Sequence, residues 1–262
     1  MAKFNIYNQE DLLRIESGTA SDLNEYSIQH DITLSGHFAP LENIQYITLN
    51  GNGNTIENLV NPMFISIFNS TVENLNLDVN ISSSYSKLGS IANESASCQF
   101  NNNKISGKIS GPGYVGGLVG LPGVTNFDNN QSCADITGVS YVGGIGGYSD
   151  SSNYYNNTTS GNISGCFFVA GIVAYTLNGI VEYNTSNSNI TSRAQYSGGI
   201  SAFSRESTVE NNLFSGNVNG AYNTSGIVGC SMSSTITDNT FSGTVISSGA
   251  ISDESICGIF IK

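Results

Sequence analysis

The sequence predicts an all-β protein, a parallel β-solenoid whose coils contain about 27 residues and three strands each. A phrase that is clearest in YVGGLVG (114–120) and YVGGIGG (141–147) recurs at a nearly constant interval, as in stacked repeats. Three apolar positions and one asparagine position recur with it. The chain also has 30 glycines and only 11% charged residues, a composition that favours short strands and turns over helices. We therefore expect one elongated domain of about eight coils that rises about 4.8 Å per coil.

The segment NQEDLLRIE (8–16) is predicted to form one short helix. Asn8 is a suitable N-cap, acidic residues follow it in the first turn, and Leu12, Leu13 and Ile15 give the helix an apolar face. The terminal coil of a solenoid exposes an apolar cross-section and unpaired strand edges to water. We expect this helix to cover that end.

Alternation of apolar and polar residues predicts strands within YSIQHDITLSG (26–36) and IQYITLNGNGNTIENL (44–59). The residues expected to point inward are Ile28, Ile32, Leu34, Ile47 and Leu49. A looser first full coil follows at 61–86. The chain is thus divided into an N-terminal cap with a lead-in strand (1–30) and a single solenoid (31–262).

Six units in strict register follow. They begin at Lys87, Tyr114, Tyr141, Phe168, Tyr196 and Asn223, at intervals of 27, 27, 27, 28 and 27 residues. The first apolar row is Ile91, Leu118, Ile145, Ile172, Ile200 and Ile227. The second is Phe100, Phe127, Tyr154, Val181, Val209 and Ile236. The third is Ile109, Ile136, Ile163, Ile190, Val218 and Val245. Three inward rows predict three strands per coil, each paired in parallel with its copy in the next coil.

One polar row is the same residue in all six units. Its members are Asn103, Asn130, Asn157, Asn184, Asn212 and Asn239. Asparagine offers two donors and an acceptor and tolerates left-handed backbone angles, which suits a corner whose polar groups must be satisfied inside the stack. We predict a buried asparagine ladder in which each replacement by alanine costs on the order of 1 to 3 kcal/mol.

The charge balance restricts the possible partners. The net charge is −12 and no basic patch is present, which argues against nucleic acid or an anionic membrane as a partner. No run of about 18 apolar residues could span a bilayer, so membrane insertion is not expected. The opening MAKFNIYNQEDLLRIES lacks the features of a secretory signal, which leaves a cytoplasmic location open.

The cysteines and glycines indicate structure rather than chemistry. Cys98, Cys133, Cys166, Cys230 and Cys257 are odd in number, form no CxxC and fall out of register, so we expect buried or half-buried free thiols and no metal site. The Gly-Gly pairs are not predicted to bind phosphate, because a strand follows them where a phosphate loop needs a helix. No cofactor is expected.

An aromatic column is the candidate binding site. Its members are Tyr114, Tyr141, Phe168 and Tyr196. Rings repeated in every coil could form a platform for sugar rings or for the apolar surface of a partner. Alternatively, the rings only stack on one another at a corner of the solenoid and contribute about 0.5 to 1.5 kcal/mol per pair. Of the two, the second interpretation is favoured.

No catalytic residues are assigned. Glu73, Asp128, Glu182 and Glu210 fall near one corner of the coil, but in different coils and separated by neutral residues. Both histidines, His30 and His37, lie near the amino terminus. The acidic residues are interpreted as solvated surface groups.

Two rows of small polar residues follow the third strand. The first is Ser106, Cys133, Ser160, Asn187, Ser215 and Ser242, and the second is Ser110, Thr137, Ser164, Thr191, Asn219 and Ile246. Regular threonine arrays order water in ice-binding solenoids, but these rows are mixed and poor in threonine. Ice binding is therefore a minor alternative.

The carboxyl end, SICGIFIK (255–262), restarts the repeat phrase. Because it ends in an apolar half coil, we expect the last coil to be shielded by another molecule, by residues 246–254, or by further chain. End-to-end self-association through this coil is one form that the shielding could take.

The repeats resemble the GLUG-motif repeats of bacterial surface proteins. GLVG (117–120) reproduces the Gly-Leu-aliphatic-Gly phrase, and GIGG (144–147) and GIVG (226–229) approximate it. DLLRI (11–15) and LNGNGNTIENL (49–59) are similar to the segments that lead into such domains. The resemblance implies a right-handed parallel β-helix and an extracellular or cell-surface location in an adhesin-like or protease-associated protein.

The leading expectation is a non-catalytic, adhesin-like binding module that presents its ladders to a glycan or a surface protein. A polysaccharide-cleaving β-helix enzyme, or a fragment of one, is the alternative. A cleft with two carboxylates about 5 to 10 Å apart would favour it. A structural spacer without a ligand is a further minor alternative.

Overall fold

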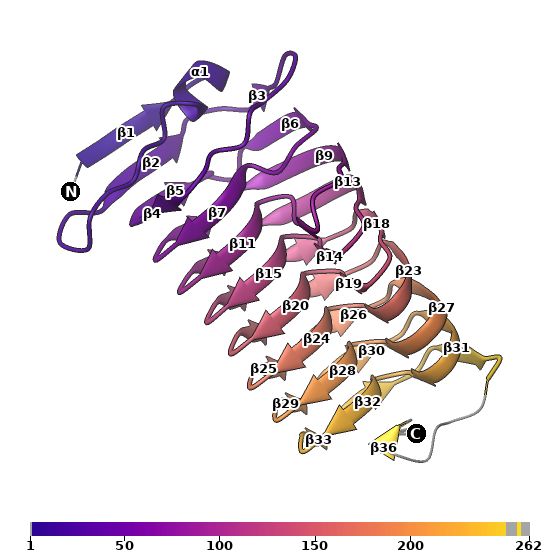
Figure 1. Cartoon of the computed structure of the whole chain (residues 1–262). Helices are drawn as coiled ribbons and strands as arrows, with labels where there is room; N and C mark the ends of the chain where they lie inside the picture. Colours follow the sequence, from indigo (N-terminus) through magenta and orange to yellow (C-terminus); the bar gives the residue numbers. More distant parts are fainter. Residues whose placement is uncertain (1, 250–255, 258–262) are drawn as a thin grey trace.

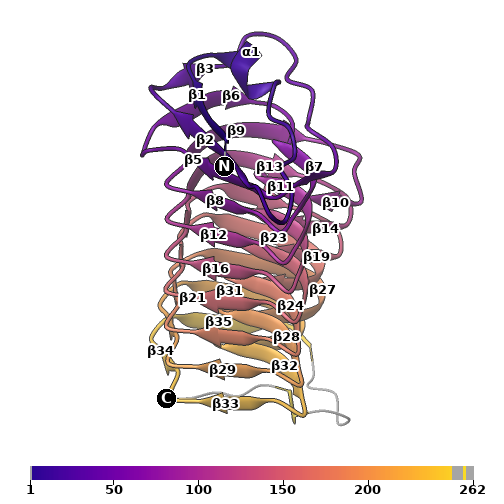
Figure 2. The same ribbon diagram turned by 90° about the vertical axis from the view of Figure 1, so that its left-hand side faces the viewer.

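Three sheets form the sides of an elongated parallel β-solenoid of about eight coils, which confirms the predicted fold class (Figure 1). The computed structural model describes residues 2–249 and 256–257. Each regular coil passes through a nine-stranded, a ten-stranded and a seventeen-stranded sheet in turn. The coils stack along one axis, with the first strands at one end of the stack and the last strands at the other (Figure 2).

The ten-stranded sheet contains one short strand from each coil. Its strands are β1 (Ala2–Ile6), β2 (Asn24–Ile28), β5 (Ile47–Asn50), β8 (Thr71–Glu73), β12 (Gln99–Asn101), β16 (Asn126–Asp128), β21 (Asn153–Tyr155), β25 (Ile180–Glu182), β29 (Thr208–Glu210) and β33 (Thr235–Thr237). The nine-stranded sheet contains β4 (Ile44–Gln45), β7 (Phe64–Phe68), β11 (Ala92–Ala96), β15 (Val119–Gly123), β20 (Gly146–Asp150), β24 (Val173–Leu177), β28 (Ser201–Arg205), β32 (Val228–Met232) and β36 (Ile256–Cys257).

The seventeen-stranded sheet has more strands than the other two because most coils contribute two or three strands to it. Its strands are β3 (Ile32–Thr33), β6 (Thr55–Leu59), β9 (Asn76–Ser82), β10 (Lys87–Leu88), β13 (Lys104–Ser110), β14 (Tyr114–Gly116), β17 (Gln131–Ser132), β18 (Asp135–Thr137), β19 (Tyr141–Gly143), β22 (Thr158–Thr159), β23 (Asn162–Ala170), β26 (Thr185–Ser186), β27 (Asn189–Gly198), β30 (Leu213–Phe214), β31 (Asn217–Ser225), β34 (Thr240–Phe241) and β35 (Thr244–Ser247).

The register places equal positions of the repeat directly over one another. Phe100 pairs with Phe127, and Phe127 pairs with Tyr154, so that their rings stack at 5.2 and 4.8 Å between centroids. The three apolar rows are buried along the stack, except that Ile236 and Val245 in the last coil are only partly buried. The five inward residues expected before the regular units are buried as well. The period of the sequence therefore determines which side chains form the core.

The amino-terminal end differs from the expectation. The helix α1 (Gln9–Leu12) is a single turn, capped by Asn8, whose Oδ1 accepts from the Asp11 backbone N–H at 3.0 Å. Leu12 and Ile15 are buried, but Leu13 is 42% exposed. The strand β1, which was not expected, precedes the helix and pairs in parallel with β2. The helix thus shares the end of the stack with a strand, because the chain already enters the ten-stranded sheet at Ala2.

The asparagine ladder is present and buried. Its members are at most 4% exposed, and the Nδ2 of each donates to the Oδ1 of the next, at 2.9 or 3.0 Å from Asn103 to Asn239. The backbone N–H of each also donates to that same Oδ1, at 2.9 to 3.0 Å. Each asparagine therefore replaces the backbone pairing that is lost where the chain turns between two sheets.

The residue with left-handed backbone angles at this corner is not the ladder asparagine, as expected, but the residue directly before it. The residues with positive φ at this corner are Asn102, Asn129, Asn156, Tyr183, Asn211 and Asp238, at 54° to 57°. They precede the ladder members, which are absent from the positive-φ positions. The turn is made by an outward residue, and this allows the next amide to point into the core.

A buried hydroxyl interrupts the second apolar row. Burial raises the pKa of Tyr154 far above the usual range, and the neighbouring Ser149 hydroxyl lowers it only in part, because no well-formed hydrogen bond joins the Tyr154 hydroxyl to a described residue. The two preceding coils carry phenylalanine at this position, at Phe100 and Phe127, and the next coil carries Val181. The tyrosine therefore carries a polar atom that the core does not use.

Tyr154→Phe is expected to raise the free energy of unfolding by about 1 kcal/mol, because it removes an unpaired buried polar group and keeps the ring. Chemical denaturation of the two proteins checks this. Tyr26→Phe is the matched control, since the Tyr26 hydroxyl donates to the Glu16 carbonyl at 3.1 Å and accepts from the Glu16 N–H at 2.9 Å. That variant is expected to lose stability. A loss in both variants contradicts the prediction.

The thiols are partly as expected. Cys98 and Cys230 are buried and Cys166 is half-buried, but Cys133 is exposed, because its row points outward from the solenoid. Burial raises the pKa of the Cys98 thiol from 9.0 to about 11, so it stays protonated at neutral pH. No helix in the described part of the chain is long and apolar enough to cross a membrane.

At the other end, β36 pairs antiparallel with β32, so that Cys257 lies opposite Cys230. The rest of the segment expected to restart the repeat, residues 255 and 258–262, lies outside the described residues. Most of the segment 246–254 that could shield the last coil lies outside them too. The shielding and the end-to-end association remain predictions.

Candidate functional site

The predicted aromatic column is one half of a larger feature. Tyr114, Tyr141, Phe168 and Tyr196 are all half-buried, and neighbouring rings lie 4.6 to 5.0 Å apart. A second column, Tyr148, Tyr175 and Phe203, runs beside it on β20, β24 and β28, with rings 4.8 and 5.1 Å apart. We call these seven residues the aromatic stripe.

The two columns interlock at the corner between the seventeen-stranded and the nine-stranded sheet. Tyr141 meets Tyr148 edge to face at 5.5 Å, and Tyr196 meets Phe203 in the same way at 5.5 Å. The chain bends between the columns at the buried glycine and aliphatic residues of the repeat phrase. Two outward positions seven residues apart thereby come together. The sequence carried a signal for the second column, since an aromatic residue recurs seven positions after the unit start in three successive units.

An ion pair takes the equivalent positions at the amino-terminal end of the stripe. In the unit before Tyr114, the two positions are Lys87 and Glu94, and the Lys87 Nζ lies 2.6 Å from the Glu94 Oε1. In the last unit, Asn223 and Cys230 occupy them. The stripe therefore covers four successive units and has defined ends.

The hydroxyls of Tyr141 and Tyr148 are uncharged. Burial raises the pKa of Tyr141, and the neighbouring hydroxyls of Tyr114, Tyr148 and Tyr175 raise it further. Burial also raises the pKa of Tyr148, as do Tyr175 and Asp150, while Arg205 acts in the opposite direction. At neutral pH these two side chains thus present neutral phenol groups.

The stacking decides what the stripe can contact. Within each column most neighbouring rings are nearly parallel, at 0° to 17°, so one ring covers the face of the next. Solvent therefore reaches mainly ring edges and hydroxyls. A sugar ring packs on an aromatic face, whereas a protein surface can pack against edges and accept hydrogen bonds from phenols. The stripe suits a protein contact better than a sugar platform.

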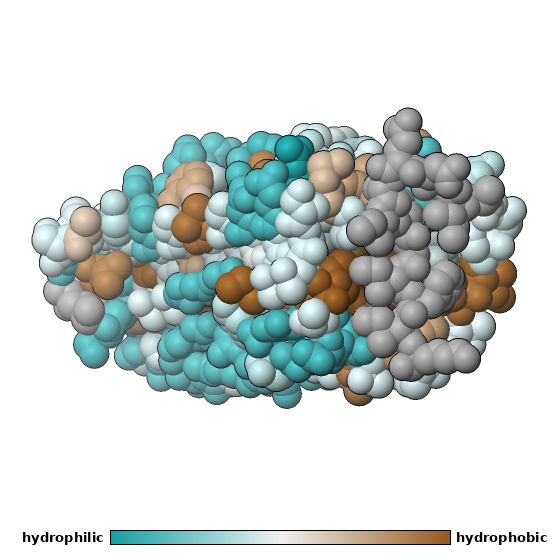
Figure 3. Space-filling view, turned by 90° about the horizontal axis from the view of Figure 1, so that it is seen from below, coloured by the Kyte–Doolittle hydropathy of each residue, from teal (hydrophilic) through white to brown (hydrophobic). Residues whose placement is uncertain are grey.

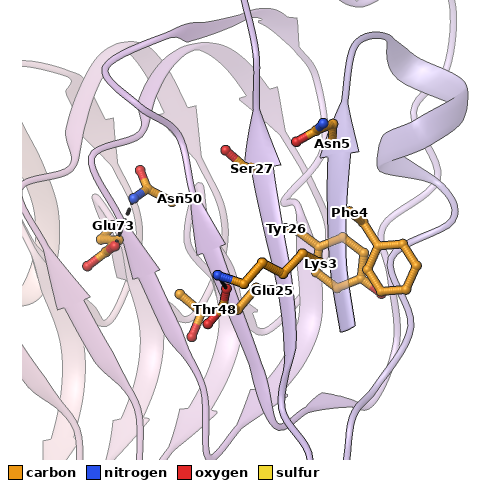
Figure 4. A pocket seen from close by; sticks show the side chains of 9 residues that line it. All are labelled: Lys3, Phe4, Asn5, Glu25, Tyr26, Ser27, Thr48, Asn50 and Glu73. Atoms are coloured by element: carbon orange, nitrogen blue, oxygen red, sulfur yellow. Dashed lines mark hydrogen bonds and ion pairs between the residues drawn. The ribbon is translucent and has the colours of Figure 1, made fainter. Parts of the chain in front are cut away.

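The outward face of the ten-stranded sheet is the second candidate. The outward column at the ends of its strands runs Glu73, Asn101, Asp128, Tyr155, Glu182 and Glu210, each paired in register with the next. Figure 4 shows the amino-terminal part of this face, a depression of about 400 Å³ in which Lys3 pairs with Glu25 at 2.9 Å and the Asn50 Nδ2 donates to the Glu73 Oε1 at 2.9 Å.

Glu73, Asp128, Glu182 and Glu210 were expected to be separated from one another by neutral residues, and the register confirms this only for some of them. Asn101 lies between Glu73 and Asp128, and Tyr155 follows Asp128, but Glu182 and Glu210 are direct register partners. Counted from the unit starts at Phe168 and Tyr196, the two glutamates hold the same repeat position, so this adjacency could be read from the sequence. Both side chains are half-buried on an outward sheet face, and the Glu210 Oε2 accepts from the Thr237 hydroxyl at 3.3 Å.

A shallow depression of about 710 Å³ continues along the same face. It extends from Glu73 to Tyr183 and is lined mainly by amides, with Tyr155 and Tyr183 at one end. Sequence reasoning missed this feature, because the lining residues come from five coils and share no single repeat position.

Other candidate chemistry is dispersed. Within residues 2–249 and 256–257, no three His, Cys, Asp or Glu side chains are placed to hold a metal ion. His30 Nδ1 lies 2.8 Å from the Asp31 carbonyl, and His37 lies beside Asn61, both near the amino-terminal end. Strands β15 and β20 follow the Gly-Gly pairs, as expected.

The rows considered for ice binding face outward on the seventeen-stranded sheet. The Thr137 and Ser164 hydroxyls bond to each other at 3.2 Å, and Ile246, at 58% exposure, ends the second row with an apolar residue. The face seen in Figure 3 is largely hydrophilic, with apolar patches along its middle.

No family model matches the chain, and no curated protein matches its sequence. The solenoid is similar to the crystal structure of a candidate immunoglobulin A1 protease from Bacteroides ovatus, with a TM-score of 0.63 at 18% identity over 94% of this chain and 84% of that one. A structure named IgA1 protease matches with a TM-score of 0.58 at 18% identity, over 94% of this chain and 21% of its own length. The likeness shows a shared fold.

Proposed function

We propose that this chain is a non-catalytic, adhesin-like recognition module at a bacterial cell surface, and that the aromatic stripe contacts a protein partner. One observation carries the proposal: seven half-buried rings in two interlocked columns turn their edges and hydroxyls to solvent across four units. Half-exposed tyrosines that pack as one rigid group are favourable contact residues, because they lose little side-chain entropy on binding.

The charge of the chain supports a partner that is neutral or basic. The chain carries a net charge of −12, so an acidic partner, or a second copy of this chain, meets repulsion at long range. The relation to GLUG-motif repeats and the surface location are parts of this proposal. No protease activity is carried over from the similar structures, because a likeness at 18% identity supports the fold and not the chemistry.

The test uses proteins of the native cell surface and of its surroundings. The immobilised chain captures binders, which are identified and purified, and their affinity is measured against variants. Tyr148→Ser with Tyr175→Ser is expected to weaken binding at least tenfold. Tyr148→Phe with Tyr175→Phe, which keeps the stacking, is expected to weaken it several-fold. Tyr7→Ser is the control, because Tyr7 is 49% exposed near the amino-terminal end, outside the stripe.

After enzymatic removal of glycans from the purified partner, the Tyr148→Ser with Tyr175→Ser variant is still expected to bind it at least tenfold more weakly than the original chain. Two results overturn the proposal: a partner that binds the stripe variants as tightly as the original chain, or a partner whose binding disappears with its glycans. Far-UV circular dichroism of each variant shows that the solenoid is retained.

A further inference from the structure

The depression on the ten-stranded sheet has a chemistry that the stripe lacks. It lies over β12, β16 and β21 and the turns that follow them, on a different side of the solenoid from the stripe. Its volume is about 710 Å³, and it is open to solvent along its length. A site of this shape suits an extended ligand that lies along the sheet.

Two tyrosines at one end of the depression have ring faces that no other described aromatic ring covers. Tyr155 ends β21, and Tyr183 follows Glu182, the register partner of Tyr155, so the two rings come from successive coils. Neither ring stacks on another ring among the described residues, in contrast to the rings of the stripe. Tyr183 is 55% exposed. Free aromatic faces are the surfaces on which the C–H groups of a sugar pack.

Polar groups with unused bonding capacity line the rest of the depression. The side-chain amides of Gln99 and Asn101 form no hydrogen bond with any described residue, and each offers two donors and an acceptor. The Asn156 Nδ2 donates to the Asp128 Oδ1 at 3.0 Å, which leaves Oδ2 as an acceptor. Burial, and then Glu182, raises the pKa of Tyr155, so its hydroxyl is also a donor. Sugar hydroxyls both donate and accept and match such a set.

The charge of the lining selects among glycans. Glu73 and Asp128 are its charged residues, and no lysine or arginine lines it. A carboxylate or sulfate on a ligand would meet two negative charges and no positive one, which is unfavourable over these short distances. The lining therefore favours an uncharged ligand.

We infer that the depression binds an uncharged oligosaccharide, with sugar rings on the faces of Tyr155 and Tyr183 and hydroxyls bonded to Gln99, Asn101 and Asp128. The proposal does not rest on the aromatic stripe, since the two surfaces share no residue. A protein partner on the stripe and a glycan in the depression can be tested separately.

The test is a glycan array that holds neutral, sialylated and uronic oligosaccharides, probed with the full chain. Binding to at least one neutral glycan is expected, and its dissociation constant is then measured by titration calorimetry. Tyr183→Asn and Tyr155→Asn are each expected to weaken it at least tenfold. Asparagine is suited to position 183, because Asn102, Asn129, Asn156 and Asn211 hold the same left-handed backbone in other coils.

Tyr7→Asn and the double variant Tyr148→Phe with Tyr175→Phe serve as controls and are expected to bind the glycan with unchanged affinity. Asp128→Asn is expected to relax the preference against acidic glycans. Three results overturn the proposal: no binding to any neutral glycan on the array, a preference for acidic glycans in the original chain, or equal affinity in both depression variants and the original chain.

Discussion

Replacing Asn157 by alanine is expected to lower the free energy of unfolding by about 3 kcal/mol. The Asn157 Oδ1 accepts from the Asn130 backbone N–H and from the Asn130 Nδ2, both at 3.0 Å. The Asn157 Nδ2 donates to the Phe127 carbonyl at 3.0 Å and to the Asn184 Oδ1 at 2.9 Å. Alanine breaks all four bonds in a region without access to water, and each buried group left unpaired costs about 1 to 3 kcal/mol.

The measurement is urea denaturation followed by far-UV circular dichroism. Asn187→Ala is the matched control, because Asn187 is exposed and its side chain makes no hydrogen bond within the described part of the chain, so a change within about 0.5 kcal/mol is expected. Asn157→Asp keeps an oxygen that can accept the two hydrogen bonds from Asn130 but removes the Nδ2 donor. Its second carboxylate oxygen would face two acceptors, so its folded pKa is raised, and this variant is expected to gain stability as the pH falls.

Since repeat proteins can unfold in stages, hydrogen exchange at the amides of coils next to Asn157 supplements the denaturation midpoint. Equal stability of Asn157→Ala and the Asn187→Ala control would show that the ladder does not hold the coils together.

Gly199→Ala is expected to lower the free energy of unfolding by about 3 kcal/mol for a different reason, overpacking. A Cβ at Gly199 would overlap the Gly226 carbonyl oxygen of the next coil and the ring of Phe214. Phe214 is fully buried, so its ring has no free space to enter. Neither the backbone of the neighbouring coil nor the ring can move without breaking the register of the stack.

Gly123→Ala is the control, because the nearest atom to a Cβ there is 3.8 Å away, and unchanged or slightly raised stability is expected. The double variant Gly199→Ala with Phe214→Ser tests the mechanism. Serine occupies the corresponding position in earlier coils, at Ser132 and Ser186. If the ring is the main obstacle, the double variant loses less stability than the sum of the two single variants. Strictly additive losses, measured by the same denaturation, argue against this coupling.

Much of the core could be predicted from the period. Once coils of about 27 residues stack, every residue lies over its copy, so the rows of Ile145, Phe127 and Asn157 follow from counting. The buried ladder was predictable for the same reason, since an amide kept in all six units needs a shared environment. Its left-handed residue was placed one position too late, because the sequence shows where the amides recur and not how the chain turns into them.

The ends of the stack were predicted less well. The strand β1 lies outside the regular repeats, and four of its five residues are exposed. The period of the repeat therefore gives no signal for it. Leu13 was assigned to an apolar helix face, but the helix ends after one turn and the side chain points outward. Helix or strand propensity and apolar periodicity predict an element poorly where that element packs against neighbours on one side only.

The sequence alone determined which residues stack, because a translation by one coil superimposes equal positions of the repeat, in the core as on the surface. It thereby determined the fold, the ladder and the first aromatic column. Only the tertiary structure decided which outward positions meet across a corner, such as Tyr141 with Tyr148, and which outward residues line one depression, such as Tyr155 and Tyr183. The reason is physical: contacts between different rows depend on how the backbone bends between strands, and that bend is set by the packing of the whole coil rather than by the repeat.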